Sequence, residues 1–553
     1  MNEEPPSSPG QGDADPHRGL NPTKRHGWQF WAIFPGLCLA SVLCALDSTI
    51  LSTALPTITA DLNSSSSYVW IINAYTVTFT AIQPFYGQFA DIFGRKSATI
   101  IAICFFLLGG GICAGAGHTS MLISGRAVQG LGGGGLSILP AMVVCDLVSL
   151  RERQKYTGLI YGAFAIGTFI GPVVGGSMVE HIGWRWIFWL NLPIGGLALL
   201  SVILFFRVSH VRSGPTMSNL GKIDYFGNTL LIGAITSILI ALSGTSVERP
   251  WESWQRLVPL LLGFMALPLY MIFENSPFCK QPTTPLRLFS HRTSSLAFLL
   301  TFLHGILLYW ASYFLPVYFQ AVLKDSPQES GIHTLAAAIP MVPFGILGGF
   351  WIAKVGHYRL NQILGFALST IAIGCFSILD QNSSTVVWVI LQIVFAAGAG
   401  IVLTATLPAI QAPLPESDVA TATATWGFIQ SLGFICGVAI PSSIFEAKFR
   451  SMIYTIDDDG LKKLLRAGGA YEHASKAFIT SLSDKLQMQV VKLFVVSLKL
   501  VWEVGLAFAI FGLLASFFVQ DIELRSNLET DFGYGGETEA IKTEKSPADL
   551  LQL

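Results

Sequence analysis

The sequence predicts an all-α integral membrane protein that crosses the bilayer many times. Only 12% of its 553 residues are charged, whereas soluble globular proteins carry about 25%. Hydrophobic residues make up 52% of the chain, and the mean hydropathy is +0.57. The apolar residues fall in long blocks such as 99–117 and 497–520, close to the ~20 residues that a helix needs to span ~30 Å of hydrocarbon. A transmembrane β-barrel would instead show short segments of alternating polarity.

Successive apolar blocks of roughly 20 residues, separated by polar connections, predict fourteen membrane-spanning helices with limits good to a few residues. The first six are expected at 29–52, 69–90, 97–117, 121–147, 157–179 and 187–207. Two more follow at 224–244 and 256–274. The last six are expected at 295–320, 330–353, 361–379, 386–410, 418–445 and 497–520. An even number of spans requires both termini to lie on the same side of the membrane.

The distribution of basic residues predicts which side that is. Lys and Arg are concentrated in the N-terminal tail and in the short loops after even-numbered spans, at Arg18, Lys24, Arg25, Arg95, Lys96, Arg151, Arg153, Lys155, Arg207, Arg212, Lys222, Lys280, Arg287, Arg292, Lys354 and Arg359. The short loops on the opposite side contain Arg185, Arg249, Arg256 and Lys324. Because cytoplasmic loops are enriched in Lys and Arg, both termini are expected in the cytoplasm. The two Asn-x-Ser sequons, at Asn63 and Asn382, then fall on the outer side as candidate glycosylation sites.

The ends of the chain differ from the apolar blocks. Residues 1–27 are rich in Pro, Gly and charge and are expected to form a disordered cytoplasmic tail. The first apolar block is too long for a signal peptide, so no cleavable leader is expected. The 446–496 connection is expected as a long outer loop, and 521–553 as a cytoplasmic C-terminal tail.

Composition also excludes several classes of protein. A formal net charge of −1 excludes a basic nucleic-acid binder. The eight cysteines contain no CxxC pair, so we expect packing residues, with neither a disulfide framework nor a metal site. Gly130, Gly132 and Gly135 spell GxGxxG, but they lie in a continuous apolar block rather than between a strand and a helix, which excludes a dinucleotide site.

Two ionisable residues within apolar blocks are the main functional candidates. A charge at mid-membrane costs about 2.5–3.5 kcal/mol on insertion scales and usually faces a cavity or a partner. Asp47, in LDSTILSTALP, is either a proton-coupling or substrate-contacting carboxylate or a structural acid bonded to a neighbouring helix. Arg126, in SGRAVQGLGGGG, cannot release its proton, so it would hold a carboxylate, a carbonyl or an anionic group, or else extend to the membrane interface.

The connection after the second span contains a charge cluster between two glycines. In GQFADIFGRK (87–96), Gly87 and Gly94 permit close helix approach and a sharp turn, and Asp91 precedes Arg95 and Lys96. Such an ion pair at a helix junction is suited to forming in one conformation and breaking in another. GFWIAKVGHYR (349–359) repeats the glycine spacing with Ala353 in place of the acid, a weak internal repeat typical of transporters built from two related halves.

The fifth span contains a stripe of glycines in GTFIGPVVGG (167–176). Gly167, Gly171 and Gly175 recur every four residues on one helix face and allow close packing. Pro172 removes a backbone hydrogen bond and favours a bend.

Together these motifs resemble the major facilitator superfamily, specifically its fourteen-span drug:proton antiporters. The resemblance covers about residues 28–520 and rests on LDSTILSTALP, GQFADIFGRK, ISGRAVQGLGGGG, GTFIGPVVGG and GWRWIFWLNLPIGG in that order. The segment AMVVCDLVSLRERQKYTGLIYG (141–162) is similar to fungal efflux pumps for toxins and secondary metabolites. The resemblance implies two six-helix bundles, at 28–210 and 291–520, with two inserted helices at 211–290.

The resemblance also implies roles for particular residues. The proton-linked acid falls on Asp47 and the motif arginine on Arg126. The cytoplasmic gate falls on Gly87, Asp91, Gly94, Arg95 and Lys96, with Asp146 as a further gate residue. The antiporter hinge falls on Gly167, Gly171, Pro172, Gly175 and Gly176.

Aromatic and amide residues on the helices that correspond to the superfamily's cavity are candidate ligand contacts: Tyr75, Gln83, Trp310, Tyr313, Gln320, Trp426 and Gln430. Aromatic walls with sparse polar groups suit small amphipathic organic molecules. Single aromatics in membrane helices also serve as packing residues or interface anchors.

The sequence therefore predicts a monomeric, proton-coupled exporter of toxins, secondary metabolites or drugs in the plasma membrane, with no cofactor. The alternative is a siderophore or basic amino-acid carrier of the same superfamily, in the plasma membrane or the vacuolar membrane, which would favour more acidic residues in its cavity. A membrane enzyme is not expected, because the ten histidines are scattered. A receptor would need larger cytoplasmic domains than these tails provide.

Overall fold

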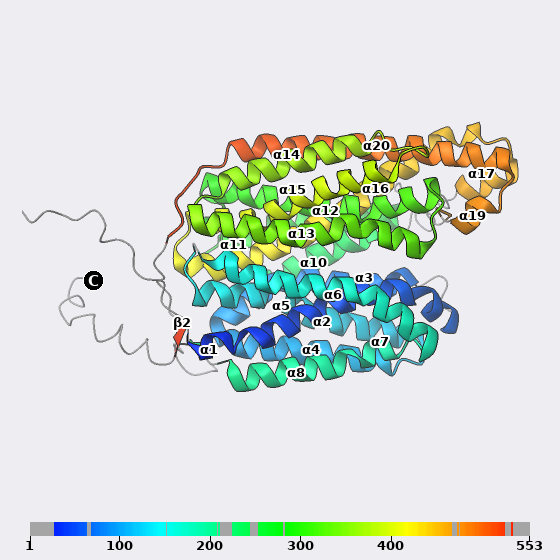
Figure 1. Ribbon diagram of the computed structural model, residues 1–553. Coiled ribbons are helices and arrows are strands. Elements are labelled where there is room, and N and C mark those ends of the chain that lie inside the picture. Colours follow the sequence, from blue (N-terminus) through cyan, green and yellow to red (C-terminus); the bar gives the residue numbers. More distant parts are fainter. Residues whose placement is uncertain are drawn as a thin grey trace, which may run out of the picture.

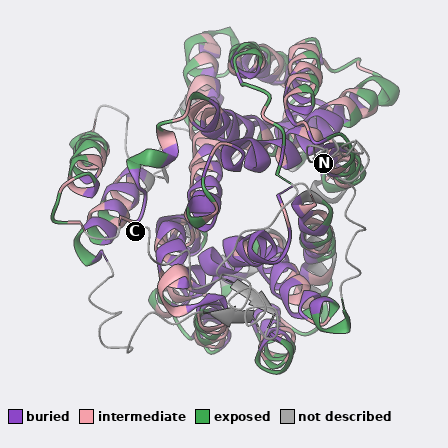
Figure 2. Cartoon of the chain, turned by 90° about the vertical axis from the view of Figure 1, so that its left-hand side faces the viewer, coloured by how far each residue is buried: buried purple, intermediate pink, exposed green. Residues whose placement is uncertain are grey.

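The computed structural model describes residues 27–62, 68–150, 152–206, 208–210, 224–243, 253–279, 282–466, 473–474, 476–525 and 532–534. Long helices that run side by side make up nearly all of these residues, in two halves that lie one above the other in Figure 1. Buried residues line the faces where helices meet, and exposed residues lie on the outer faces (Figure 2).

The N-terminal half begins with the short helix α1 (Trp28–Trp31) and continues with long helices. These are α2 (Phe34–Asp61), α3 (Tyr68–Phe93), α4 (Arg95–Ala114), α5 (Thr119–Leu147) and α6 (Arg153–His181), followed by α7 (Trp186–Trp189) and α8 (Asn191–Phe205). Helix α2 packs against α6 and α8, and α5 packs against α3 and α4. The helices are apolar over most of their surfaces, as expected when one face meets protein and the other meets lipid.

Two helices stand between the halves in sequence. Helices α10 (Tyr225–Ser243) and α11 (Trp254–Glu274) pack against each other, and α10 also contacts α3 and α16. Gln88 of α3 accepts hydrogen bonds from the Asn228 side chain (2.9 Å) and the Asp224 backbone (3.3 Å). The inserted pair is therefore attached to the N-terminal half by polar as well as apolar contacts.

The C-terminal half repeats the pattern with longer helices. Its elements are η1 (Leu286–Phe289), α12 (Arg292–Val317), the π-helical turn η2 (Tyr318–Val322), α13 (Pro327–Val355), α14 (Arg359–Phe376), α15 (Thr385–Gln411), η3 (Glu416–Asp418), α16 (Val419–Met452), η4 (Ile453–Thr455), α17 (Asp459–Arg466), α19 (Lys476–Thr480) and α20 (Asp484–Phe517). One extended apolar core joins α12, α14, α15, α16 and α20 and includes Leu150 of the N-terminal half, whereas Ala420 and Ala424 of α16 belong to a core of the N-terminal half.

The strands β1 (Val208–His210) and β2 (Phe532–Tyr534) pair antiparallel, with Ser209 opposite Gly533. Strand β2, helix α1 and the last turn of α20 all lie at the left of Figure 1, and α17 and α19 lie at the opposite end of the helices. We call these two ends the tail side and the loop side.

Eleven of the described helical segments are long and apolar enough to cross a membrane. They include α4, α5, α12, α15 and α20. Helices α3, α6 and α10 are not among the eleven, although they lie parallel to them (Figure 1) and pack against α5, α2 and α11 respectively. The expectation of an all-helical, multi-span protein is confirmed, and the count of fourteen spans stays a prediction.

Glycine residues produce the two related helix junctions. Gly94, between α3 and α4, has φ +88°, and Gly356, between α13 and α14, has φ +83°. Side chains with a Cβ rarely adopt this left-handed region, so the repeated glycine spacing of the sequence corresponds to a repeated sharp turn at the tail side.

Helices α16 and α20 extend beyond the limits predicted from hydropathy. Hydropathy predicts that one span ends at 445 and another begins at 497, whereas α16 ends at Met452 and α20 begins at Asp484. Their extra turns lie at the loop side, where Asp457 binds Lys485 Nζ (2.6 Å) and Gln489 Nε2 (2.9 Å) of α20. Lys485 and Gln489 hold the pKa of Asp457 below its usual range. Hydropathy predicts the apolar part of a helix and does not predict polar turns that continue beyond it.

Candidate functional site

Asp47 of α2 and Arg126 of α5 form a buried ion pair. Arg126 Nη1 donates to Asp47 Oδ2 over 2.7 Å, and the two residues are 2% and 1% exposed. The guanidinium also donates to Gln129 Oε1 (2.9 Å) and to the backbone oxygen of Ile71 (3.4 Å). Because breaking a buried pair leaves an uncompensated charge, the two residues fix α2 against α5 as long as both are charged.

Two amides that sequence reasoning missed complete the carboxylate's hydrogen bonds. Gln129 Nε2 donates to Asp47 Oδ1 over 2.7 Å, and Asn191 Nδ2 of α8 donates to the same oxygen over 2.9 Å. Both amides are fully buried. Gln129 lies one helical turn after Arg126, so its i+3 spacing was a readable signal, whereas nothing in the sequence links Asn191 to Asp47.

An aromatic ring covers the arginine. The Cζ atom of Arg126 lies 4.3 Å from the centroid of the Tyr75 ring, a cation–π distance. Tyr75 stacks on Phe79, and its hydroxyl lies 3.7 Å from Cys44 Sγ. The candidate cavity residue Tyr75 therefore belongs to the immediate surroundings of the ion pair.

The residues expected to form a cytoplasmic gate are brought together at the tail side. Arg95, 2% exposed, donates from Nη1 to Asp91 Oδ1 and from Nε to Asp146 Oδ2, both over 2.6 Å. Asp91 Oδ2 accepts a hydrogen bond from Thr421 of α16 (3.1 Å). Lys96 instead donates to the backbone oxygen of Ile203 in α8 (2.8 Å). The charge cluster thus links three N-terminal helices and reaches across to the C-terminal half.

The first glycine of this motif lies at the contact between the halves. A Cβ built on Gly87 would lie 2.5 Å from the Cβ of Ala424 in α16. No side chain fits between α3 and α16 at this level, so the close approach of the two helices requires a glycine here.

The glycines of the predicted hinge lie at the contact of α6 with α2. A Cβ on Gly167 would lie 2.6 Å from the backbone oxygen of Val42, and one on Gly171 would collide with the Thr49 hydroxyl. Gly175 is buried. Pro172 and Gly176 lie within α6, but their side-chain surroundings are outside what the structure describes.

A second polar link between the halves was not recognised from the sequence. Arg153 of α6 is 1% exposed and binds Glu416 and Gln411 Oε1 (3.1 Å) of the C-terminal half. Gln411 Nε2 in turn lies 3.4 Å from Cys145 Sγ of α5. We call Arg153, Gln411 and Glu416 the tail-side latch. In the sequence Arg153 was one of many basic loop residues, and a partner 263 positions away gives no local signal.

Gln83 of α3 bridges the two halves closer to the membrane centre. Its Nε2 donates to Ser137 of α5 (3.1 Å), and its Oε1 accepts from Ser431 of α16 (3.2 Å). Gln430, beside Ser431, is 9% exposed. Among the candidate cavity residues, Tyr75 therefore lies against the ion pair and Gln83 lies at the contact between the halves.

The remaining cavity candidates are distributed over the C-terminal half. Trp310 is fully buried against Phe508 of α20, and Trp426 donates its indole N–H to Thr406 of α15 (3.0 Å). Tyr313 is 41% exposed, and Gln320 in η2 donates to Ser330 (3.4 Å) at the loop side. The two tryptophans have packing contacts within one bundle, and a ligand-binding role for any of these four residues stays a prediction.

Two further predicted features can be placed in part. Asn382 is exposed in the turn between α14 and α15, where its N–H donates to Asp380 Oδ1, and Asn63 lies outside the described residues. None of the eight cysteines forms a disulfide within the part of the chain that the structure describes.

Comparisons with known proteins agree with this architecture. The chain is 49% identical over 514 residues to the efflux pump FUS6 of Gibberella fujikuroi, which covers 93% of this chain and 92% of the relative. It is 44% identical to the MFS-type efflux pump LUC4 of a Fusarium species (94% and 93% covered) and 44% identical to the acurin A biosynthesis cluster MFS-type transporter of Aspergillus aculeatus (95% and 94%).

Solved structures resemble the fold at low sequence identity. The human organic anion transporter MFSD10 superposes with a TM-score of 0.57 at 14% identity, covering 90% of this chain and all of that protein. The proton:xylose symporter XylE superposes with a TM-score of 0.56 at 14% identity, covering 90% and 98%. Residues 37–438 match the sequence profile of the Major Facilitator Superfamily. The chain therefore belongs to the major facilitator superfamily of transporters.

Proposed function

We propose that this chain is a proton-coupled exporter of small amphipathic metabolites or toxins that works by alternating access. The observation that carries the proposal is the buried Asp47–Arg126 pair (2.7 Å), which lies within two apolar helices. Its relatives named as efflux pumps, and the relative named for a metabolite biosynthesis cluster, support export as the direction and natural products as the cargo.

Protonation of Asp47 would couple the proton to a change of conformation. A neutral carboxyl no longer compensates Arg126, so the guanidinium must find new partners or water. Gln129 and Asn191, which donate to the carboxylate, would then lose a charged acceptor. The proton therefore changes the interactions among α2, α5 and α8 at once, as a coupling group requires.

The driving force is sufficient for export. One proton moving inward across 100 mV supplies about 2.3 kcal/mol, enough for roughly a 40-fold concentration gradient at ~1.4 kcal/mol per factor of ten. A pH difference adds to this gradient.

The placement in the membrane follows from the same proposal. Helices α3, α6 and α10 would cross with the eleven apolar segments to give fourteen spans, in two six-helix bundles and an inserted pair. The tail side would face the cytoplasm by the positive-inside rule, with a monomer in the plasma membrane; the vacuolar membrane is the alternative.

The test is transport in proteoliposomes with an imposed pH gradient and a fluorescent amphipathic drug as cargo. Wild-type protein should accumulate the drug against its gradient and move protons in return. Asp47→Asn should lose both activities. Asp61→Asn is the matched control, because Asp61 ends the same helix in an exposed pair with Arg185 (3.2 Å).

Full gradient-driven transport by Asp47→Asn would refute proton coupling through this residue. Drug transport with no proton movement by the wild type would refute antiport itself. Accumulation of a ferric siderophore or arginine in place of the drug would favour the alternative carrier.

A further inference from the structure

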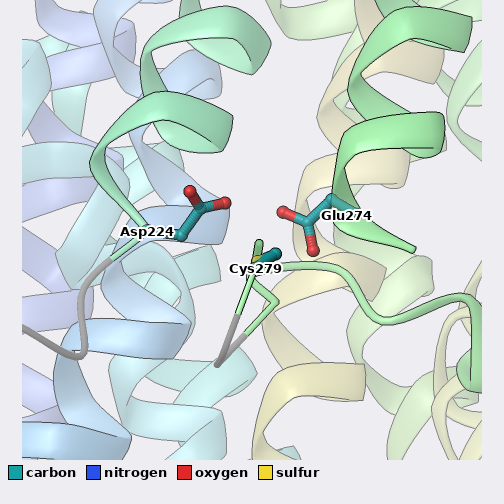
Figure 3. A group of neighbouring side chains, drawn as sticks. All are labelled: Asp224, Glu274 and Cys279. Carbon is teal, nitrogen blue, oxygen red and sulfur yellow. The ribbon is translucent and has the colours of Figure 1, made fainter. Parts of the chain in front are cut away.

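Three potential metal ligands meet at the tail side of the inserted helix pair, apart from the Asp47–Arg126 site. Asp224 precedes the first turn of α10, Glu274 ends α11, and Cys279 lies in the turn that follows α11. One ligand atom from each lies within 4.8 Å of the other two. In Figure 3 the two carboxylates point toward each other, with the cysteine beside the space between them.

The Asp224 carboxylate is held in place but only half satisfied. Its Oδ1 accepts the Gly227 N–H (2.8 Å) and so caps α10. Its Oδ2 is buried without a hydrogen-bond partner among the described residues, and the residue is 8% exposed. A Cβ on Gly227 would collide with this carboxylate, so the glycine leaves room for it to turn back over the helix end.

The Glu274 carboxylate is oriented by the backbone that follows α11. The N–H groups of Thr283 and Thr284 donate to its two oxygens over 3.1 and 3.3 Å. Glu274 is 5% exposed. Two buried carboxylates that face each other repel when both are charged, so the arrangement requires a cation or a proton between them.

We propose that Asp224, Glu274 and Cys279 bind a borderline-soft divalent cation such as Zn²⁺. Thiolate and carboxylate together are ligands that Zn²⁺ accepts, and water would fill the fourth position. Zn–O and Zn–S bonds of about 2.0–2.3 Å place ligand atoms about 3.5 Å apart, so ligand atoms within 4.8 Å of one another need to approach by no more than about 1.3 Å. Cys279 lies in a turn rather than a helix, where a small adjustment is least costly. Binding releases the thiol proton to solvent.

A bound cation would join the start of α10 to the connection between α11 and α12. One ligand comes from the start of α10 and two come from the end of α11 and the turn after it. Gln88 of α3 already accepts a hydrogen bond from the same end of α10. The site would therefore hold the inserted helices in register on the N-terminal half, separately from the proton-coupling pair.

The first test uses full-length protein in detergent after treatment with a chelator. Zn²⁺ at micromolar concentration should raise the melting temperature, and Co²⁺ should give a thiolate-to-metal absorption band at one equivalent. Asp224→Asn and Cys279→Ser should weaken binding at least tenfold. Cys104→Ser is the matched control, because Cys104 is exposed on α4, and it should bind as the wild type does.

A second test needs no variant and so does not depend on folding of the mutants. Zn²⁺ should slow alkylation of Cys279 in the wild-type protein, measured by peptide mass, and should leave Cys104 unchanged. Equal alkylation rates with and without Zn²⁺, or a Co²⁺ band that survives in Cys279→Ser, would overturn the proposal. Stabilisation by Glu274→Gln without any metal binding would show instead that the two carboxyls share a proton.

Discussion

At the scale of single residues, the buried charge pair joins three helices of the N-terminal half, α2, α5 and α8. Asp47 accepts hydrogen bonds from Arg126, Gln129 and Asn191, which come from α5 and α8. Hydrogen bonds to charged groups contribute about 1.5–3 kcal/mol each, so the donors hold the carboxylate in one orientation. Under the proposed mechanism the same bonds weaken when Asp47 binds a proton.

We expect Asn191→Leu to lower both thermal stability and proton-driven transport. The change removes one donor to Asp47 Oδ1 within a fully buried site, at a cost of about 1.5–3 kcal/mol. Melting temperature in detergent and gradient-driven uptake in proteoliposomes are the measurements. Asn382→Leu, at an exposed loop position, is the control and should match the wild type. Wild-type stability and transport in Asn191→Leu would contradict the positioning role.

The sequence identifies charges in the membrane but not the neutral groups that bind them. Asp47 and Arg126 stand out because each is costly in an apolar block. Gln129 and Asn191 carry no such cost, and amides are ordinary in helices, so only the packed structure reveals them. Arg153 is the opposite case. Its charge is evident in the sequence, but its place among the basic residues of a loop indicates only the side of the membrane and gives no sign of the buried contact with Glu416.

At the scale of helices, glycine fixes the contact between α2 and α6. Gly167 and Gly171 lie against the backbone and side chains of α2, whereas Gly162, earlier in the same helix, has open space where its Cβ would lie. Within α6, packing therefore requires glycine at 167 and 171, whereas a larger residue would fit at 162.

We expect Gly167→Ala to reduce stability and transport and Gly162→Ala to preserve both. The added methyl group at 167 would lie 2.6 Å from the Val42 backbone oxygen, and overpacking of this kind typically costs 1–3 kcal/mol. At 162 alanine meets nothing within 4 Å and improves helix propensity by roughly 1 kcal/mol relative to glycine. Melting temperature and uptake rate measure both effects. Equal behaviour of the two variants would contradict the packing argument.

The helix order and the approximate spans could be predicted because hydropathy reports burial in lipid directly. The end of α16 and the start of α20 could not, because these turns lie beyond the apolar blocks, where contacts such as Asp457 with Lys485 hold the chain. Helices α3 and α6 cover the apolar blocks 69–90 and 157–179 that predict spans in the sequence. Their place beside α5 and α2 comes from packing.

At the scale of the whole molecule, the hydrogen bonds between the described residues of the two halves lie mostly toward the tail side. Asp91 meets Thr421 there, and Arg153 meets Gln411 and Glu416. Gln83 and Ser431 extend the contact toward the membrane centre. A transporter that alternates must break these bonds to open its tail side, so they set part of the free-energy difference between its two conformations.

The latch gives a direct test of this view, with Cys145 as a natural reporter. Cys145 is 1% exposed, and its Sγ lies 3.7 Å from Thr423 Oγ1 and 3.4 Å from Gln411 Nε2. Because the thiol is covered by the opposite half, reagents reach it only when the tail side opens.

We expect Glu416→Gln to increase the rate of Cys145 alkylation several-fold. Arg153 would lose its charged partner, and Arg525, 3.8 Å from the same carboxylate, would lose a second attraction, so the closed tail side would become less stable relative to the open one. A membrane-impermeant maleimide applied at the tail side, with peptide mapping, measures the rate. Glu503→Gln, at an exposed position of α20, should leave it unchanged. If Glu416→Gln also leaves the rate unchanged, the latch does not hold the halves together, and closure rests on other contacts, such as Asp91 with Thr421 and the close approach of Gly87 to Ala424.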